Sequence, residues 1–198
     1  MSVRVTRRPT RLPPPAPAAV RDASRRFDKA RYGRVDPLLR RIFAEHPKNT
    51  NFDDVLLKVA LLNTLYNTRL LAVVAMADHI QALKPDGAIA KGDPAVVDQI
   101  ARLTIRGKQR RHYSFATKYC SWHQPEQFPI YDNQVAALLL LYKREWLFAE
   151  FTHDSLRDYD EYKGVIRSFQ VHFHLSDFTF KQIDKFLWLT KTELDAKR

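Results

Sequence analysis

The chain of 198 residues carries 33 lysines and arginines against 22 aspartates and glutamates, a formal net charge of +11 that favours polyanions and above all nucleic acid. Its single cysteine, Cys120, excludes an internal disulfide, and no apolar run approaches the roughly 20 residues of a transmembrane helix. Because the first residues also lack a signal-peptide pattern, we expect a cytoplasmic protein, associated with the nucleoid if it is bacterial.

Positive charge is concentrated at the N-terminus, where residues 1–50 hold 13 lysines and arginines against 4 aspartates and glutamates. Residues 1–19 are rich in arginine and proline and cannot pack a core, so we predict a basic, partly disordered leader. Its arginines could follow a phosphate backbone, or it could be a plain flexible segment. Residues 20–198 predict one all-α domain, since glycine and β-branched runs are scarce. A division into two subdomains, with a cleft between residues 50–85 and 100–150, stays open.

Apolar residues recur at helical spacing along this domain. The predicted helices cover, in chain order, residues 20–33, 36–47, 52–83 with a break at 67–68, 93–103, 113–124, 132–148, 155–174 and 176–195. Aspartate followed by proline, at Asp36-Pro37 and at Asp93-Pro94, predicts two of the helix starts, and Ser176 is the predicted cap of the last helix.

The most informative stretch is residues 113–135, YSFATKYCSWHQPEQFPIYDNQV. Its first helix ends before Pro125, because proline cannot continue the helical hydrogen bonds. The loop that follows leads to Asp132, at the head of the apolar run from Val135 to Leu141. An aspartate in this place is a good N-cap, and a plain cap is the simpler interpretation. We predict that Asp132 has a catalytic role as well.

The segment Phe128-Pro129-Ile130-Tyr131-Asp132, with Val135 one turn later, resembles the helix-hairpin-helix (HhH-GPD) DNA glycosylase superfamily. In that superfamily an aspartate after a similar proline turn is the catalytic carboxylate, so the resemblance implies a compact glycosylase-like fold with Asp132 as that group. The superfamily hairpin reads L-P-G-(V/I)-G, and residues 103–107 are its nearest counterpart here, with one glycine instead of two.

Bifunctional members of the superfamily add a lysine at the start of the helix after the hairpin. The best-aligned position in this chain is near Gln109, and Lys108 and Lys118 are the lysines closest to it. Lys118 is therefore a second catalytic candidate, with a surface lysine as the alternative. The mismatch predicts a monofunctional enzyme that uses water rather than lysine as the nucleophile.

A cluster on an earlier helix is the candidate base pocket. Asn63, Tyr66 and Asn67 share one helical face at i, i+3 and i+4, and amides can read donors and acceptors on a base edge. Trp122 and Tyr131, together with Tyr66, could stack on an extruded base. The alternative is a polar network that satisfies the backbone groups where the helix breaks.

A cationic stretch precedes the central motif. It contains no acidic residue, and its members are Arg102, Arg106, Gly107, Lys108, Arg110 and Arg111. In the superfamily the hairpin presents backbone N–H groups to DNA phosphates, so we predict that this stretch binds DNA. The alternative is a solvated face between two helices. The expected partner is double-stranded DNA with a damaged or modified base, bound by a monomer.

Cleavage of an N-glycosidic bond builds positive charge on the sugar, which a fixed carboxylate such as Asp132 stabilises. We expect neither a metal nor a cofactor, because His112, Cys120 and His123 lack a zinc-ligand spacing and the chain contains no nucleotide-binding glycine pattern. The sequence thus predicts a DNA glycosylase, acting in repair or in defence against phage with modified DNA. A non-catalytic helical DNA- or RNA-binding protein and a helical interaction module are the alternatives.

Overall fold

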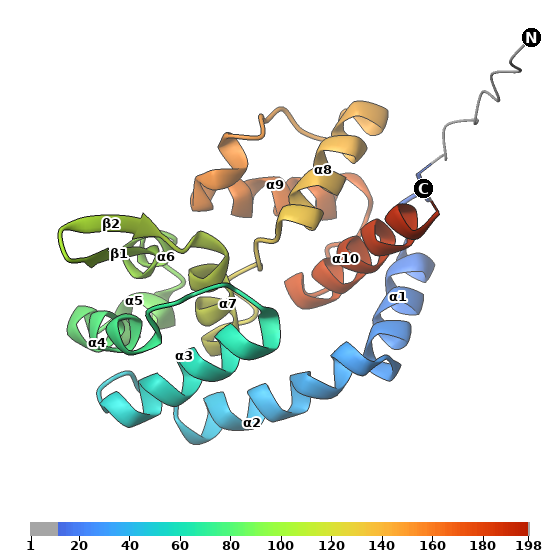
Figure 1. Cartoon of the computed structure of the whole chain (residues 1–198). Helices are drawn as coiled ribbons and strands as arrows, with labels where there is room; N and C mark the ends of the chain where they lie inside the picture. Colours follow the sequence, from blue (N-terminus) through green and yellow to red (C-terminus); the bar gives the residue numbers. More distant parts are fainter. Residues whose placement is uncertain (1–11, 198) are drawn as a thin grey trace, which may run out of the picture.

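The computed structural model describes residues 12–197, and helices dominate this part of the chain (Figure 1). The α-helices are α1 (Pro17–Lys29), α2 (Asp36–Glu45), α3 (Phe52–Tyr66), α4 (Val73–Leu83), α5 (Asp86–Lys91), α6 (Ala95–Ala101), α7 (Tyr113–His123), α8 (Asn133–Trp146), α9 (Tyr159–His172) and α10 (Phe180–Ala196). Two short 3-10 helices, η1 (Arg31–Val35) and η2 (Ser155–Arg157), precede α2 and α9. The predicted compact helical fold is confirmed.

The predicted break between residues 67 and 68 is also confirmed. Asn67 ends α3 in the left-handed conformation, with φ at 49°, and a non-helical segment separates it from α4. Asparagine tolerates this backbone conformation better than most residues, because its short polar side chain can bond locally.

The predicted N-terminal leader is wrong over its last residues, and residues 1–11 lie outside the described part. Leu12 is buried, and the Tyr142 hydroxyl donates a hydrogen bond to the carbonyl of Pro13 (2.9 Å). Helix α1 then begins at Pro17, a residue suited to the first helical turn because it has no N–H to satisfy.

Two of the predicted caps are wrong. Asp36 lies inside the first turn of α2, where it is buried and makes no capping hydrogen bond. The cap of α10 is Thr179 rather than Ser176, in a reciprocal capping box with Gln182. Asp132 does cap α8, as the sequence predicts.

A β-hairpin stands where the sequence predicts the end of one helix and a helix-hairpin loop. Strands β1 (Arg102–Ile105) and β2 (Lys108–Arg111) pair antiparallel, with Arg102 opposite Arg111. Arg106 and Gly107 both have positive φ, at 49° and 75°, which is the signature of a two-residue turn that matches strand twist. The prediction of a helix-hairpin loop here is wrong, while membership of the glycosylase superfamily stays a prediction.

Helix α7 forms the centre of the core and packs against α2, α3 and α6. Almost all of its residues from Tyr113 to Ser121 are buried, among them the polar side chain of Lys118. Helices α1 and α10 lie side by side at another edge of the molecule (Figure 1). Between residues 12 and 197, no helix combines the length and the hydropathy needed to cross a membrane.

Candidate active site

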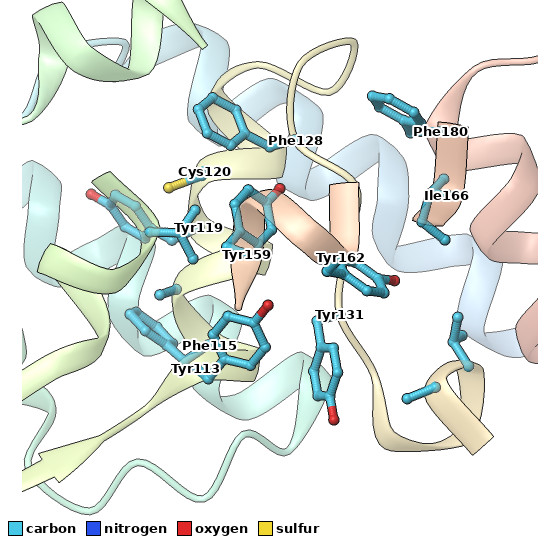
Figure 2. Packing of buried hydrophobic residues seen from close by; sticks show 14 of the residues in the cluster. Tyr113, Phe115, Tyr119, Cys120, Phe128, Tyr131, Tyr159, Tyr162, Ile166 and Phe180 are labelled. Carbon is cyan, nitrogen blue, oxygen red and sulfur yellow. The ribbon is translucent and has the colours of Figure 1, made fainter. Parts of the chain in front are cut away.

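The loop before Asp132 is held by the hydroxyl groups of two buried tyrosines from α9. Tyr159 donates to the carbonyl of Pro129 (3.0 Å), and Tyr162 donates to the carbonyl of Ile130 (2.6 Å). Figure 2 shows the two rings next to each other beside the loop. Because buried carbonyls in a loop need partners, these bonds fix the path of the backbone.

The last residue of the loop, Tyr131, is fixed at both of its backbone groups by α7. Its N–H donates to Oγ1 of Thr117 (3.1 Å), and its carbonyl accepts from the Ser114 hydroxyl (3.2 Å). Four polar groups of the backbone between Pro129 and Tyr131 are thus bonded to rigid helices immediately before Asp132. A side chain supported in this way keeps its position without reorganisation, which is what catalysis by a charged group needs.

Asp132 divides its two carboxylate oxygens between structure and the site. Oδ1 accepts the capping hydrogen bond from the N–H of Gln134 (2.8 Å). Oδ2 lies 3.9 Å from Nζ of Lys118, and 31% of the aspartate side chain is exposed. One oxygen is therefore open to a ligand.

Lys118 is almost completely buried, so the alternative of a surface lysine is wrong. Its Nζ donates to Oγ of Ser114 (2.6 Å) and to the carbonyl of Tyr131 (3.2 Å). Burial lowers the pKa of Lys118, and the nearby charge of Asp132 acts in the opposite direction. A lowered pKa raises the fraction of neutral amine, the nucleophilic form.

A cavity of about 190 Å³ adjoins this pair of residues. Five of its lining side chains are ionisable acids and lysines: Asp36, Lys118, Asp132, Lys181 and Asp184. Its other lining side chains include the aromatic rings of Phe27, Tyr66 and Trp188. Since an apolar cavity of about 150 Å³ binds benzene, this one has room for one planar ring system.

Tyr66 is the one member of the predicted base pocket that lines this cavity. Its hydroxyl accepts hydrogen bonds from Nε1 of Trp122 (3.2 Å) and from Nζ of Lys181 (3.2 Å). Burial raises the pKa of Tyr66, so the phenol stays neutral. Trp122 thus lies behind Tyr66 and supports it.

The other predicted pocket residues have different positions. The Asn63 amide bonds Thr68 and both backbone groups of Leu70, so it forms the helix-end network that was the alternative interpretation. Asn67 is the exposed C-cap of α3. The Tyr131 ring packs 4.7 Å from that of Tyr113, outside the cavity.

Sequence reasoning missed the acids and the lysine that face Lys118 across the cavity. Lys181, Asp184 and Trp188 lie on α10 at i, i+3 and i+7, half-buried beside the face that packs into the protein. Polar residues on such a face are a sequence signal, since buried polar groups need partners. For Asp36 and Phe27, no local sequence pattern indicates a place at the cavity.

Two of the predicted DNA-binding arginines are already paired. Nε of Arg102 lies 2.5 Å and Nε of Arg111 lies 2.8 Å from the carboxylate of Asp98, and the Arg111 guanidinium lies over the Tyr113 ring. The prediction that both bind phosphate overlooked Asp98, because this acid lies in the preceding helix and not in the stretch itself.

The tip of the hairpin is free to meet a polyanion. Arg106, Gly107, Lys108 and Arg110 are exposed, and the three cations have no ion pair among the described residues. A cleft of about 260 Å³ at the base of the hairpin is lined by Arg111, His112 and Arg157 and, next to Asp132, by Asn133. A basic surface therefore extends from the hairpin towards the candidate site.

No group of three or more His, Cys, Asp or Glu side chains between residues 12 and 197 is placed to hold a metal ion. Cys120 is completely buried, and burial raises the pKa of its thiol. His123 is half-buried, and burial lowers its pKa to about 3. Of these two side chains, Cys120 belongs to the core.

A family model named HI_0787_N and described as an N-terminal domain matches residues 19–127 of this chain. An uncharacterized protein of Haemophilus influenzae is 36% identical over 150 residues, which cover 75% of this chain and 72% of that protein. No solved structure matches the chain. The span matched by the family model includes Lys118 and ends before Asp132.

Proposed function

The chain belongs to the HI_0787_N family, and for this member we propose a DNA glycosylase that extrudes a damaged or modified base and hydrolyses its N-glycosidic bond. One observation carries the proposal. Asp132 is held on a rigid loop at the head of α8, beside the buried Lys118 and at the wall of a cavity with room for one ring system.

The reaction assigns a definite task to Asp132. As the bond between C1′ and the base breaks, the base leaves with the electron pair, and positive charge develops on the sugar ring. The free oxygen of Asp132 stabilises that charge and takes a proton from the attacking water, whose oxygen bonds to C1′. The departing base nitrogen is protonated in turn.

The cavity supplies the place for the extruded base. Removing a base from the duplex stack costs a few kcal/mol, which stacking and hydrogen bonds in the enzyme must offset. Tyr66, Phe27 and Trp188 line the cavity with aromatic surface, and stacking on such rings is worth about 1–3 kcal/mol per base.

Charge supports DNA as the partner. The chain has a net charge of +11, and part of it lies on the hairpin as three exposed cations, Arg106, Lys108 and Arg110. Contacts of this kind bind the phosphate backbone without reading sequence, and they weaken as salt rises. The helical interaction module predicts no salt-dependent binding to nucleic acid.

The burial of Lys118 favours a second route beside hydrolysis. A neutral amine at this position could attack C1′ itself and form a covalent imine with the opened sugar, after which the strand can be cut. The same active site then acts as a lyase, and borohydride reduction of the imine would trap the protein on DNA.

The proposal is tested by mass spectrometry of bases released from duplex DNA of several modified genomes and from duplexes with defined lesions. The parent protein should release at least one modified or damaged base, and Asp132→Asn should lose about 100- to 1,000-fold in rate while binding DNA equally well. Asp158→Asn is the matched control, because Asp158 caps α9 in the same way and does not line the cavity. Equal DNA binding with no base released from any substrate would leave the non-catalytic DNA-binding protein as the better account.

A further inference from the structure

Asp184 is a half-buried acid without a partner among the described residues. It lines the cavity from α10, and it makes no hydrogen bond or ion pair with any residue of the described range 12–197. Burial raises its pKa to about 6, with Lys181 and Lys118 acting in the opposite direction and Asp132 and Asp36 adding to the rise. A carboxylate that lines a cavity and has no protein partner is an acceptor available to a ligand.

Asp36 lines the same cavity, but lysines hold its carboxylate. Only 7% of Asp36 is exposed, and its Oδ2 accepts no hydrogen bond within the described chain. The nearest cations are Nζ of Lys185 at 3.4 Å and Nζ of Lys181 at 3.7 Å. Lysines therefore already neutralise Asp36, whereas the carboxylate of Asp184 stays available to a ligand.

Lys181 provides a donor one helical turn before Asp184. Its Nζ uses one N–H on the Tyr66 hydroxyl (3.2 Å), and a lysine carries three. Its contact with the Trp122 ring, 4.4 Å from the centroid, holds the side chain against the cavity wall. A matching ligand would present a hydrogen-bond acceptor to Lys181 and, on the same edge, hydrogen-bond donors to Asp184.

We propose that the cavity takes the Watson–Crick edge of a guanine-type base, with Asp184 accepting from the ring N1–H and the 2-amino group and Lys181 donating to the carbonyl O6. This inference rests on the proposed function, for which it names the substrate class. Guanine derivatives changed at other ring positions, such as C8 or N7, keep this edge.

Other bases fit this arrangement less well. Among the four standard bases, guanine alone carries two neighbouring N–H donors on one edge, so it alone can give a carboxylate two parallel hydrogen bonds. Adenine and cytosine place a ring acceptor beside the amino group, and thymine places its N–H between two carbonyls. Each of these sets a lone pair against Asp184.

The test uses the full chain and soluble bases, so it does not depend on cleavage. We would measure the affinity for 9-methylguanine, 9-methylhypoxanthine and 9-methyladenine by calorimetry. The parent should bind 9-methylguanine about 10- to 100-fold more tightly than 9-methylhypoxanthine, which lacks only the 2-amino group, because a hydrogen bond to a charged acceptor is among the strong ones. Asp184→Asn should remove this preference, and Asp177→Asn, at an exposed site just before α10, should keep it.

Equal affinity for the three bases, no binding of any, or an unchanged preference in Asp184→Asn would overturn the inference. Failure of the proposed function looks different. In that case 9-methylguanine binds through Asp184, but no duplex loses a base. Conversely, release of adenine- or pyrimidine-type bases alone would keep the glycosylase and end the assignment to guanine.

Discussion

Two buried lysines of this protein, Lys58 and Lys118, have opposite surroundings. Nζ of Lys58 donates to three oxygens, the carbonyls of His46 (2.9 Å) and Lys48 (2.8 Å) and Oδ1 of Asn49 (2.9 Å), which uses all of its donors. Nζ of Lys118 makes two hydrogen bonds and lies beside the carboxylate of Asp132 on a cavity wall.

The difference separates a lysine that only stabilises the fold from one that can bind or attack a ligand. Lys58 ties a loop to α3, and removing it would leave its two carbonyl partners without this donor, while Oδ1 of Asn49 keeps its bond from the Tyr119 hydroxyl. Lys118 has a donor to spare and a lowered pKa, so it can meet a ligand as an amine. Burial alone would not have told the two apart, but the completeness of their hydrogen bonds does.

Of the two lysines, Lys118 should give the larger effect on base release. Lys118→Gln should lower base release by roughly 100-fold or more, the loss that follows removal of one preorganised group. In borohydride trapping on a cleavable duplex, the parent should give a covalent adduct that both Lys118→Gln and Lys118→Arg lack, since neither forms an imine. Full activity in Lys118→Arg, with no adduct in the parent, would show that Lys118 is structural like Lys58.

The next effect concerns stability. Lys58→Met should lower the free energy of unfolding by about 2–4 kcal/mol, because two carbonyls lose their donor and Oδ1 of Asn49 loses one of its two bonds. Base release per folded molecule should be unchanged. Denaturant unfolding measures the first quantity, and a loss below 1 kcal/mol would remove the distinction between the two lysines.

This comparison has a pH dependence as well. Burial lowers the pKa of Lys58 to about 8, so above this pH the folded protein holds fewer protons than the unfolded chain. The stability of the parent relative to Lys58→Met should therefore rise between about pH 8 and 10.5. A constant difference over this range would contradict the buried position of the amine.

The smallest effects concern the carboxylates that face the two lysines. Asp86 accepts from the backbone N–H (3.1 Å) and from Nδ2 (2.6 Å) of Asn49, so Asp86→Asn should destabilise the protein by about 1–2 kcal/mol. Asp184→Asn should stabilise it by a similar amount at pH 7.5, since Asp184 has no partner and its pKa is raised.

The sign at Asp184 follows from proton binding. With a pKa near 6, the folded protein binds a proton more readily than the unfolded chain, so the parent gains stability as the pH falls from about 6 to 4. The advantage of Asp184→Asn should disappear over that window in thermal unfolding. Destabilisation by Asp184→Asn at pH 7.5 would mean that Asp184 has a structural role.

The helix pattern and the cap of the catalytic candidate could be predicted from the sequence, because both are local. Pro125 and Pro129 end one helix, and Asp132 opens the next in front of an apolar run. The burial of Lys118 could not be predicted, since it depends on the helices that surround α7. The pairing of Arg102 and Arg111 with Asp98 could not be predicted either, because it depends on how the hairpin folds back onto α6.

The β-hairpin was missed for a different reason. Residues 102–111 are mostly polar, so they show neither the alternating pattern of a half-buried strand nor the apolar period of a helix. The one available signal was Gly107 after Arg106, where the turn needs two positive φ angles. The cavity itself joins α1, α2, α3, α7 and α10, and no local pattern reports such an assembly.

The most direct test of the central claim is the single-turnover rate of base release by Asp132→Asn and by Asp158→Asn, on a substrate that the parent cleaves, with duplex affinity measured in parallel. Both aspartates cap helices, and only Asp132 faces the cavity. We predict a loss of about 100- to 1,000-fold in rate for Asp132→Asn, near-parental rate for Asp158→Asn, and equal affinity for both. Equal rates for the two variants would show that Asp132 is a helix cap and nothing more.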